Sequence, residues 1–563
     1  MPSMAQVLFA DAVLAVGSHY LWFRKYEPTS YRVISAVILL LTSPVTYTLL
    51  NVTGNAPTAI ALGVGTFMAA LFTSIIVYRL SPWHPLSSCP GPLICKVTKM
   101  WTAYLAWTGK THLYYLGLHE KYGRIVRIGP NDISVTDKAL FPHILGAQGM
   151  PKGPVWENRR IVTARDSRGH RSLHAVRDLK LHGELRKPWN KAFGKEPLKD
   201  YEIALVKNAA ILVEQLQDVC RDGEEVLIDG AQWLSYFSFD FMGDMVFGKS
   251  QKFLTEGDPN GVWDVMQESL VFRTVAQHIP WIRPLVPFLP SSFLRADTAF
   301  RKFAASQAKA RAQSEPLSRD LFYHLISNTE VEPGTSVLPL IMADAVLAIF
   351  GGSDTSATTF SNVLYYLVRY PEWQMKVRKE VDDALRFVAE RNGSSAFPDL
   401  DELAEWGVLN AVINETLRLQ PGAPTLLQRG PAPGSGGKQL GNIFLPEGTT
   451  VQVPPYAVHR DSRYFYPRTK DFWPERWFRG PEAEGGCVLD RSVFIPFSMG
   501  PANCVGKPLA LKQLRYVVAV LVHNFEFRFP EGYDAADWES EMKDRFLMVK
   551  GELPVLINIS QGP

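Results

Sequence analysis

The chain has 563 residues, of which 46% are hydrophobic and 12% aromatic, a composition that can bury a large core and excludes a disordered or fibrous protein. The net charge is only +3 and no long basic stretch is present, so nucleic acid is not an expected partner. The five cysteines lack Cys-x-x-Cys spacing, which argues against a disulfide scaffold or structural zinc site and favours a reducing, cytosol-facing compartment.

Residues 1–80 contain three apolar stretches, at about 6–23, 33–50 and 58–78. Each approaches the roughly 20 residues with which a helix spans a bilayer, so we predict a membrane anchor with up to three transmembrane helices. The first stretch differs from the others because it contains Asp11 and His19. The alternative is a single spanning helix, with the other two lying on the membrane surface or in the core.

Basic residues flank these stretches, between the first two at Arg24, Lys25 and Arg32, and after the third at Arg79. Because positive flanks stay in the cytosol, we predict a luminal N-terminus and a cytosolic main domain. No basic region precedes the first stretch, which argues against a cleaved signal peptide. Asn51 begins a glycosylation sequon on the predicted luminal loop, but this loop is so short that we do not expect the site to be used.

Residues 81–95 are rich in proline, which fixes backbone angles and removes amide donors, and we predict a stiff hinge there. The rest of the chain, residues 96–563, has no further linker and forms one large domain. Residues 124–135 predict two short strands joined by a turn. Periodic stretches predict helices at about 198–220, 230–248, 259–277, 296–314, 337–369 and 371–392. The fold class is therefore mainly α with minor β.

Two segments of this domain stand out by composition. Residues 280–290 are apolar and too rich in proline to be helical, which fits either a loop that covers the core or one that dips into the bilayer near a substrate entrance. Residues 182–193 are basic and contain Trp189. A basic helix face is most often solvated, and it is also suited to docking an acidic electron donor.

An apolar stretch at 341–350, interrupted by Asp344, continues into Gly351 and Gly352 and then Asp354 and Thr355. Two glycines inside a helix cost about 1 kcal/mol each relative to alanine, so a helix that tolerates them needs the space. Alone, the pattern indicates only a kink. Its functional interpretation is a widened groove that holds dioxygen and water, with Asp354 and Thr355 delivering protons.

One cysteine lies in a loop between glycines, in the run Phe497 to Gly506. Gly500 and Gly506 allow the backbone to turn tightly and to approach a flat macrocycle, while amides around Cys504 can hydrogen-bond its sulfur. These are the requirements of a haem-thiolate ligand loop. By itself, the pattern also fits a buried cysteine in a glycine-containing turn.

The spacing Phe497-x-x-Gly500-x-x-x-Cys504-x-Gly506 resembles the haem-binding signature of the cytochrome P450 family. The resemblance implies a P450 fold over about residues 90–560, haem b as cofactor, and Cys504 as the axial ligand of the iron. Two residues before the cysteine the family has Arg or His, which helps to anchor a haem propionate. This chain has Ala502 there, so another residue must supply the charge.

The resemblance also implies roles for residues outside the ligand loop. Gly-x-Asp-Thr ending at Asp354 and Thr355 is similar to the oxygen-activation motif. Glu415, Arg418 and Arg476 correspond to a buried structural network; from the sequence alone, i, i+3 spacing places the first two on one helix face. The expected propionate contacts are Trp189, Arg186, His182 and Arg429. Segments 421–429 and 546–549 are expected to line the substrate pocket.

Together these motifs imply a monooxygenase in the endoplasmic reticulum membrane, which uses O2 and electrons from NADPH. NADPH-cytochrome P450 reductase is the expected partner, with cytochrome b5 as a second candidate. The anchor and the apolar pocket segments favour a lipophilic substrate, and the phrases around 460–465 and 500–504 are similar to fungal members in secondary metabolism. A terpenoid is the first hypothesis; polyketide-derived or aromatic metabolites, fatty acids and xenobiotics remain open. A haem-thiolate isomerase or synthase acting without reductase, and a catalytically silent haem protein, are the alternatives.

Overall fold

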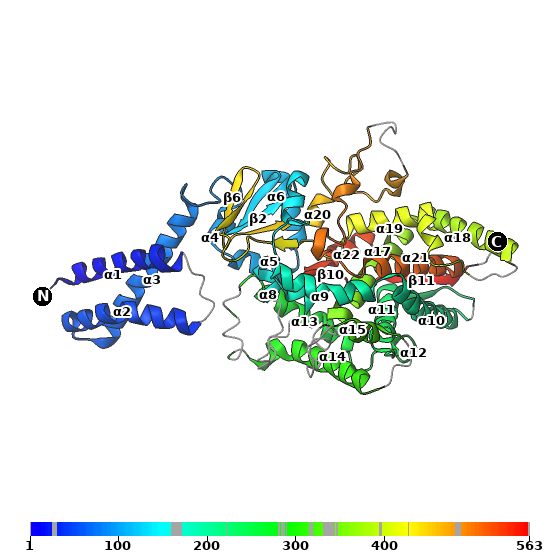
Figure 1. The fold of residues 1–563 in the computed structure, drawn as a ribbon, viewed down its shortest axis with the longest axis horizontal. Helices are drawn as coiled ribbons and strands as arrows, with labels where there is room; N and C mark the ends of the chain where they lie inside the picture. Colours follow the sequence, from blue (N-terminus) through cyan, green and yellow to red (C-terminus); the bar gives the residue numbers. More distant parts are fainter. Residues whose placement is uncertain are drawn as a thin grey trace.

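The chain is mainly helical with a few short strands, as predicted. The computed structural model describes residues 2–24, 31–158, 172–221, 223–279, 290–314, 319–329, 347–392, 397–425, 427–478 and 486–560, and the single residues 282, 288 and 344. Figure 1 shows an N-terminal group of helices extending from one end of a large helical domain, with the C-terminus at the far end. The predicted segment 280–290 lies almost entirely outside the described residues, as does 337–343.

Three N-terminal helices are long and apolar enough to cross a membrane, which suggests membrane anchoring. They are α1 (Met4–Ser18), continued by the π-helical turn η1 (His19–Phe23), α2 (Tyr31–Thr53) and α3 (Ala56–Leu80). Asp11 and His19, the polar residues of the first stretch, are both buried, and His19 Nδ1 lies 2.8 Å from Ser74 Oγ. Polar groups are costly in lipid, so they face the interior of the helix group.

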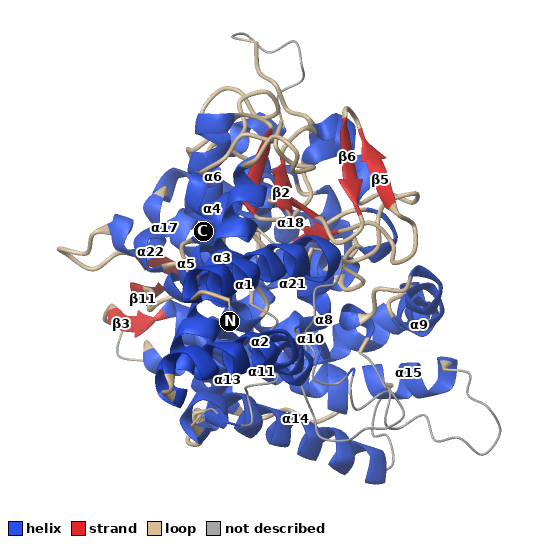
Figure 2. Cartoon of the chain, turned by 90° about the vertical axis from the view of Figure 1, so that its left-hand side faces the viewer, coloured by secondary structure: helices blue, strands red, loops and turns tan. Residues whose placement is uncertain are grey.

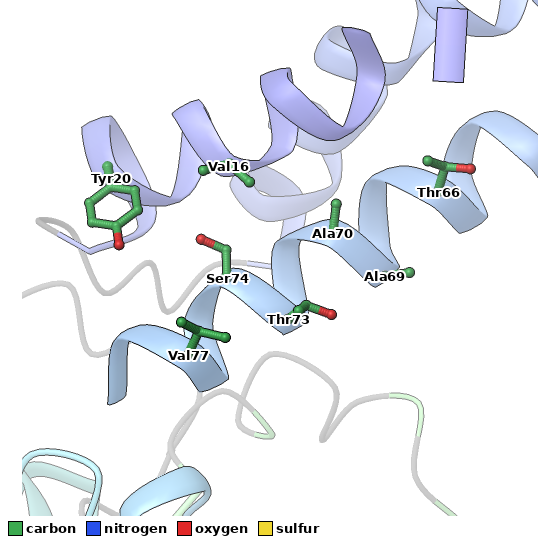
Figure 3. A pocket seen from close by; sticks show the side chains of 8 residues that line it. All are labelled: Val16, Tyr20, Thr66, Ala69, Ala70, Thr73, Ser74 and Val77. Atoms are coloured by element: carbon green, nitrogen blue, oxygen red, sulfur yellow. The ribbon is translucent and has the colours of Figure 1, made fainter. Parts of the chain in front are cut away.

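A hollow of 620 Å³ lies between the first and third of these helices, lined by Val16, Tyr20, Thr66, Ala69, Ala70, Thr73, Ser74 and Val77. Figure 3 shows these side chains on the facing turns of the two helices. The hollow is an open groove of the anchor, walled mainly by small and hydroxylated side chains.

The segment that joins the anchor to the large domain packs against strand β1 (Ile125–Gly129). Leu86 and Cys89 are buried in the core of the sheet. The buried Arg127 side chain donates to the carbonyl oxygen of Arg79 (3.1 Å) and contacts Nε2 of His84 (3.2 Å), and its backbone N–H donates to Pro90 O (2.7 Å). The predicted hinge is therefore held against the domain, and helix α4 (Leu93–Val97) already begins inside it.

The predicted strand pair at 124–135 is confirmed, with Ile125 opposite Val135. It belongs to a four-stranded sheet in the order β1-β2-β7-β4, in which β2 and β7 are parallel. Three smaller sheets are formed by β5 with β6, by β3, β11 and β8, and by β9 with β10. The bounds are β2 Asp132–Val135, β3 Val226–Asp229, β4 Leu427–Arg429, β5 Gly437–Leu440, β6 Ile443–Pro446, β7 Thr450–Val453, β8 Phe525–Arg528, β9 Lys543–Arg545, β10 Leu547–Val549 and β11 Pro554–Ile559.

The predicted helices are confirmed to within a few residues wherever the structure describes them. The large domain contains α5 Met100–Thr108, α6 Thr111–Tyr122, α7 Phe141–Ile144, α8 Pro154–Asn158, α9 Leu179–Ala192, α10 Lys195–Val219, α11 Gly230–Phe247, α12 Phe253–Glu256, α13 Val262–Ala276, α14 Arg295–Gln313, α15 Leu321–Asn328, α17 Thr355–Arg369, α18 Pro371–Asn392, α19 Gly407–Leu419, α20 Pro455–Val458, α21 Lys507–Asn524 and α22 Ala535–Glu541. Helices α11 and α17 pack together in the core. Figure 2 shows the helices as the bulk of the domain and the strands toward its margins.

Candidate active site

A cavity of 390 Å³ opens in the core of the large domain beside Cys504. Its walls come from α9, α11 and α13, from the helical turn at 350–355, from β4, from the loop 496–506 and from the start of α21. Most lining side chains are apolar, and the segments 421–429 and 546–549, predicted to line the pocket, contribute Gly422, Ala423, Leu427, Arg429, Phe546 and Leu547. The structure thus brings the predicted ligand loop, helix turn and pocket segments to one space.

The loop around Cys504 is shaped by close backbone contacts. Gly500 has φ +71°, and a Cβ added there would lie 2.0 Å from the carbonyl oxygen of Leu145. Only glycine fits such an approach. The Cys504 N–H donates to Phe497 O (2.9 Å), which closes the loop. Cys504 is exposed to the cavity, whereas the other four cysteines are buried.

The surroundings of the sulfur act on its charge in opposite directions. Burial raises the pKa of the Cys504 thiol, while the backbone amides of Gly506 and Lys507 and the guanidinium of Arg186 favour the thiolate. Within the described residues, no group of three or more His, Cys, Asp or Glu side chains could hold a metal ion. One sulfur ligand facing a cavity suits a metal that arrives inside a prosthetic group.

Four of the basic residues that line the same cavity form a basic cluster, namely Lys152, His182, Arg186 and Arg429. Burial lowers the pKa of each, to about 3 for His182 and about 10 for Arg429. Neighbouring cations lower the pKa of Lys152 and His182 further, whereas Cys504 opposes the effect of burial on the pKa of Arg186. Across the described ranges, no carboxylate forms an ion pair with any of them. Lys152 and Arg429 are buried and Arg186 is half-buried. Cations taken out of water need a counter-charge, so these three residues fit a ligand with carboxylates.

The hydrogen bonds of the basic cluster go to backbone and amide oxygens. Arg186 donates to Asn503 O (2.7 Å) and Oδ1 (3.0 Å), which ties α9 to the ligand loop. Lys152 Nζ donates to the carbonyl of His174 (3.0 Å), and Arg429 Nη1 donates to Gln428 O (2.9 Å). Lys152 was missed from the sequence because only an isolated bridge between it and Arg429, far apart in the chain, brings it to the cavity.

Trp189 lines the cavity, but its indole N–H does not point to an open acceptor site. Nε1 donates to Asp344 Oδ2 (3.0 Å), whose Oδ1 accepts the Leu173 N–H (3.0 Å). Burial raises the pKa of Asp344 to about 6, against the effect of these two hydrogen bonds. The Trp189 ring stacks on Phe193, with an interplanar angle of 4°. The indole N–H was expected to donate to a haem propionate, whereas in the structure it donates to Asp344.

The helix over the cavity widens where the two glycines lie. Residues Phe350–Asp354 form a π-helical turn, a geometry that adds space in a helix and often marks functional sites. No atom lies within 4 Å of a Cβ added at Gly351, which lines the cavity, whereas a Cβ at Gly352 would lie 2.2 Å from Met242 Cε of α11. Gly351 therefore leaves space in the cavity, and Gly352 permits close packing of the π-helical turn on α11.

Thr355 and Asp354 face different surroundings. Thr355 lines the cavity and its hydroxyl donates to Gly351 O (2.6 Å). The fully buried Asp354 does not line it; Oδ1 accepts from Gln267 Nε2 (2.6 Å), and Oδ2 has no partner among the described residues. Burial raises the pKa of Asp354, while Lys550 and Gln267 oppose this rise. The carboxyl thus lies behind the turn that carries the hydroxyl.

Glu415 is the centre of a fully buried network, as predicted. It accepts two hydrogen bonds from Arg418 (2.9 and 2.8 Å) and one from Arg476 Nε (3.0 Å). Trp473 N–H and Trp477 Nε1 also donate to it, each at 3.0 Å. None of these five residues lines the cavity, so their contribution is to hold α19 against the segment 473–477.

The whole large domain can be compared with known proteins. The sequence profile of the cytochrome P450 family matches residues 88–556. The chain belongs to this family. This P450 is 31% identical over 552 residues to Cytochrome P450 67 of Uromyces fabae, with 95% of the chain and 96% of that relative covered.

Two further relatives are also covered along nearly their whole length. Tryprostatin B 6-hydroxylase of Aspergillus fumigatus is 31% identical over 96% of this P450 and 92% of its own chain. The cytochrome P450 monooxygenase notG' of Aspergillus versicolor is 29% identical over 99% and 98%. The protein is a cytochrome P450 monooxygenase, as several of its relatives are by name, notG' among them.

Proposed function

We propose that this P450 binds haem b through Cys504 and oxidises a lipophilic small molecule with O2 and electrons from NADPH, delivered by NADPH-cytochrome P450 reductase. The observation that carries the proposal is the cavity itself. One wall presents a single thiol sulfur, and the basic cluster presents buried cations without a carboxylate partner in the described chain. Haem brings what both lack, an iron for the thiolate and two carboxylates for the cations.

Different residues of the chain would hold the thiolate ligand and the propionates of the haem. The amides of Gly506 and Lys507 favour the thiolate form of Cys504. Lys152, Arg186 and Arg429 would pair with the propionates, so the charge absent at Ala502 is supplied from other elements. Phe497 lines the cavity beside the cysteine. When bound, the haem supplies the activation of dioxygen and the insertion of one oxygen atom into a C–H bond.

Thr355 and Asp354 are proposed to move protons. Thr355 lines the cavity, and its hydroxyl, which donates to Gly351 O, would turn to donate to a ligand held there. The neighbouring Asp354 carboxyl, one of whose oxygens has no partner among the described residues, would then replace the proton. A proton route of this kind supports a monooxygenase over an isomerase or synthase, which needs no proton delivery. The apolar walls bind the substrate and exclude water.

The surroundings of the enzyme follow from its anchor. Residues 1–80 are proposed to span the endoplasmic reticulum membrane, with the domain from the 81–95 segment onward in the cytosol, where the reductase and cytochrome b5 can reach it. The Asn51 sequon, predicted to lie on a loop, falls in the last turn of α2 and stays without an assigned use. A bilayer-anchored enzyme with an apolar cavity is suited to a lipophilic substrate that partitions into the membrane.

The names of the relatives bear on the chemical class of the substrate. Several relatives are fungal enzymes of secondary metabolism, and one is named for the 6-hydroxylation of tryprostatin B, which favours hydroxylation of a fungal metabolite here. The terpenoid hypothesis stays a prediction, because no relative named above acts, by its name, on a terpenoid. Oxidation of fatty acids or xenobiotics is the alternative.

Replacing the ligand tests the proposal directly. The haem-loaded wild type, reduced and exposed to carbon monoxide, is expected to show the thiolate-type Soret band. Cys504→Ser should lose this band, while the control Cys487→Ser, a buried cysteine outside the cavity, should keep it. A thiolate band that survives in Cys504→Ser would contradict the proposed ligand.

A further inference from the structure

A second cationic group lines the cavity, apart from the basic cluster described above. It is Arg273 of α13. Its Nε–H donates to Asp297 Oδ1 of α14 (2.5 Å), and its guanidinium carbon lies 5.0 Å from the centre of the Phe350 ring. Phe350 in turn packs on Phe300, with ring centres 4.4 Å apart. The guanidinium is therefore held on one edge and on one face before any ligand arrives.

The charges around Arg273 do not balance. Asp297 also pairs with Arg301 (3.1 Å), so two arginines share one carboxylate. The side chains of Arg273, Asp297 and Arg301 are only 14%, 10% and 19% exposed, respectively. Among the described residues one positive charge is therefore left without a counter-charge, in a poorly solvated place where charges interact strongly. In the described structure no acceptor is hydrogen-bonded to Nη1 of Arg273.

The haem does not account for this charge. In the proposed function its two carboxylates pair with Lys152, Arg186 and Arg429, and Arg186 is bonded to the loop around Cys504. Arg273 belongs to a different wall, formed by α13 and the π-helical turn, and it is the only charged side chain that the described part of this wall contributes to the cavity. Its neighbours along the lining are apolar, among them Met242, Leu270 and Phe350.

We infer that Arg273 binds a carboxylate of the substrate, and that the substrate is a lipophilic molecule with one acidic group. The inference rests on the proposed function because it takes this cavity as the substrate site. A guanidinium with one edge occupied by Asp297 still offers N–H donors to a carboxylate oxygen. The carboxylate also neutralises the excess charge, and the apolar walls bind the rest of the molecule. The acidic group is the anchor, and a carbon elsewhere in the molecule is the one oxidised.

The inference is tested by binding to the haem-loaded protein. The probes are matched sets of dodecanoic, hexadecanoic and phenyl-substituted alkanoic acids, each with its methyl ester and primary amide. Dissociation constants are taken from the Soret spin-state shift and, independently of the haem spectrum, from equilibrium dialysis. We expect at least one acid to bind the wild type about 10- to 100-fold more tightly than its ester and amide, as a hydrogen bond between charged groups would give.

Variants assign this preference to Arg273. Arg273→Met keeps the length of the side chain and should bind acid and ester equally, while Arg273→Lys should retain most of the preference. Arg301→Met leaves a neutral Arg273–Asp297 pair and should reduce the preference by a smaller factor. The matched control is Arg295→Met, an exposed arginine of the same α14 helix outside the cavity, which should behave as wild type.

Two results overturn the inference. One is a panel in which no acid binds more tightly than its ester, including a panel in which no acid binds. The other is an acid preference that persists in Arg273→Met. The carbon monoxide spectrum of the same preparations separates the two proposals. A thiolate band without acid preference refutes only the role of Arg273, whereas loss of the band refutes the haem-thiolate assignment and leaves the dialysis result to judge Arg273.

Discussion

Replacing Glu415 by glutamine should strongly destabilise the fold, although the side chain keeps its size. Glu415 accepts five hydrogen bonds in the wild type, three on Oε1 and two on Oε2. In Glu415→Gln one oxygen becomes an NH2 group facing N–H donors, and Arg418 and Arg476 lose their shared counter-charge while remaining fully buried. Removing one partner of a buried ion pair costs about 3–5 kcal/mol, a large part of the roughly 5–15 kcal/mol by which a protein is stable.

The assay is chemical denaturation of the haem-loaded protein, followed by circular dichroism and by the Soret band. The free energy of unfolding should fall by the amount given above, with a parallel fall in the yield of haem-loaded protein. The control is Glu402→Gln, an exposed glutamate outside the network, which should change stability by about 0.5 kcal/mol or less. A loss below about 1 kcal/mol in Glu415→Gln would refute the reasoning that this buried charge is indispensable to its two arginines.

Three further predictions concern the cofactor, the protons and the pH. Lys152→Met should bind haem about 10- to 100-fold more weakly than wild type, as measured by transfer of the haem to apomyoglobin. The exposed Lys180→Met should bind haem as tightly as wild type. Equal haem affinities of wild type and Lys152→Met would contradict the role of the basic cluster. Thr355→Ala and Asp354→Asn should lower product formed per NADPH by about 10²-fold, with the difference appearing as hydrogen peroxide, and unchanged coupling would contradict proton delivery. Burial raises the pKa of Glu415, but its arginines outweigh this and hold it below the ordinary 4.5. The stabilisation that ionised Glu415 gives to the fold is therefore complete above about pH 4.5, and it is lost as the pH falls through the lowered pKa. The stability gap between wild type and Glu415→Gln should narrow only below about pH 5, and a gap that narrows at neutral pH would point to another group.

Local sequence patterns predicted the elements well where one physical cause dominates. Apolar periodicity placed α10, α11, α13, α14 and α18 to within a few residues, because a buried helix face repeats every three or four residues whatever its partner. The paired glycines at 351 and 352 likewise indicated the widened turn, since their cost needs a local reason. The tight turn before Cys504 was predictable because Gly500 is required by a close contact.

Features that depend on distant contacts could not be predicted in the same way. Lys152 reaches the cavity through pairing with Arg429, 277 positions later in the chain, and the indole N–H of Trp189 is taken by Asp344. The predicted hinge was inferred from proline content alone, which reports backbone stiffness but not what the segment packs on. Arg273 was not singled out, because an arginine on a helix is ordinary until its neighbours are known.

The packing of the 81–92 segment decides where a soluble form of this enzyme can begin. A cut in the last turn of α3, leaving the chain from Arg79 onward, would keep the Arg79 carbonyl and the His84 imidazole that Arg127 contacts. A cut at residue 92 would instead uncover the core patch now covered by Leu86 and Cys89 and leave a buried guanidinium short of partners. For expression without detergent, the chain should therefore begin no later than residue 79. A chain that begins further along is expected to aggregate.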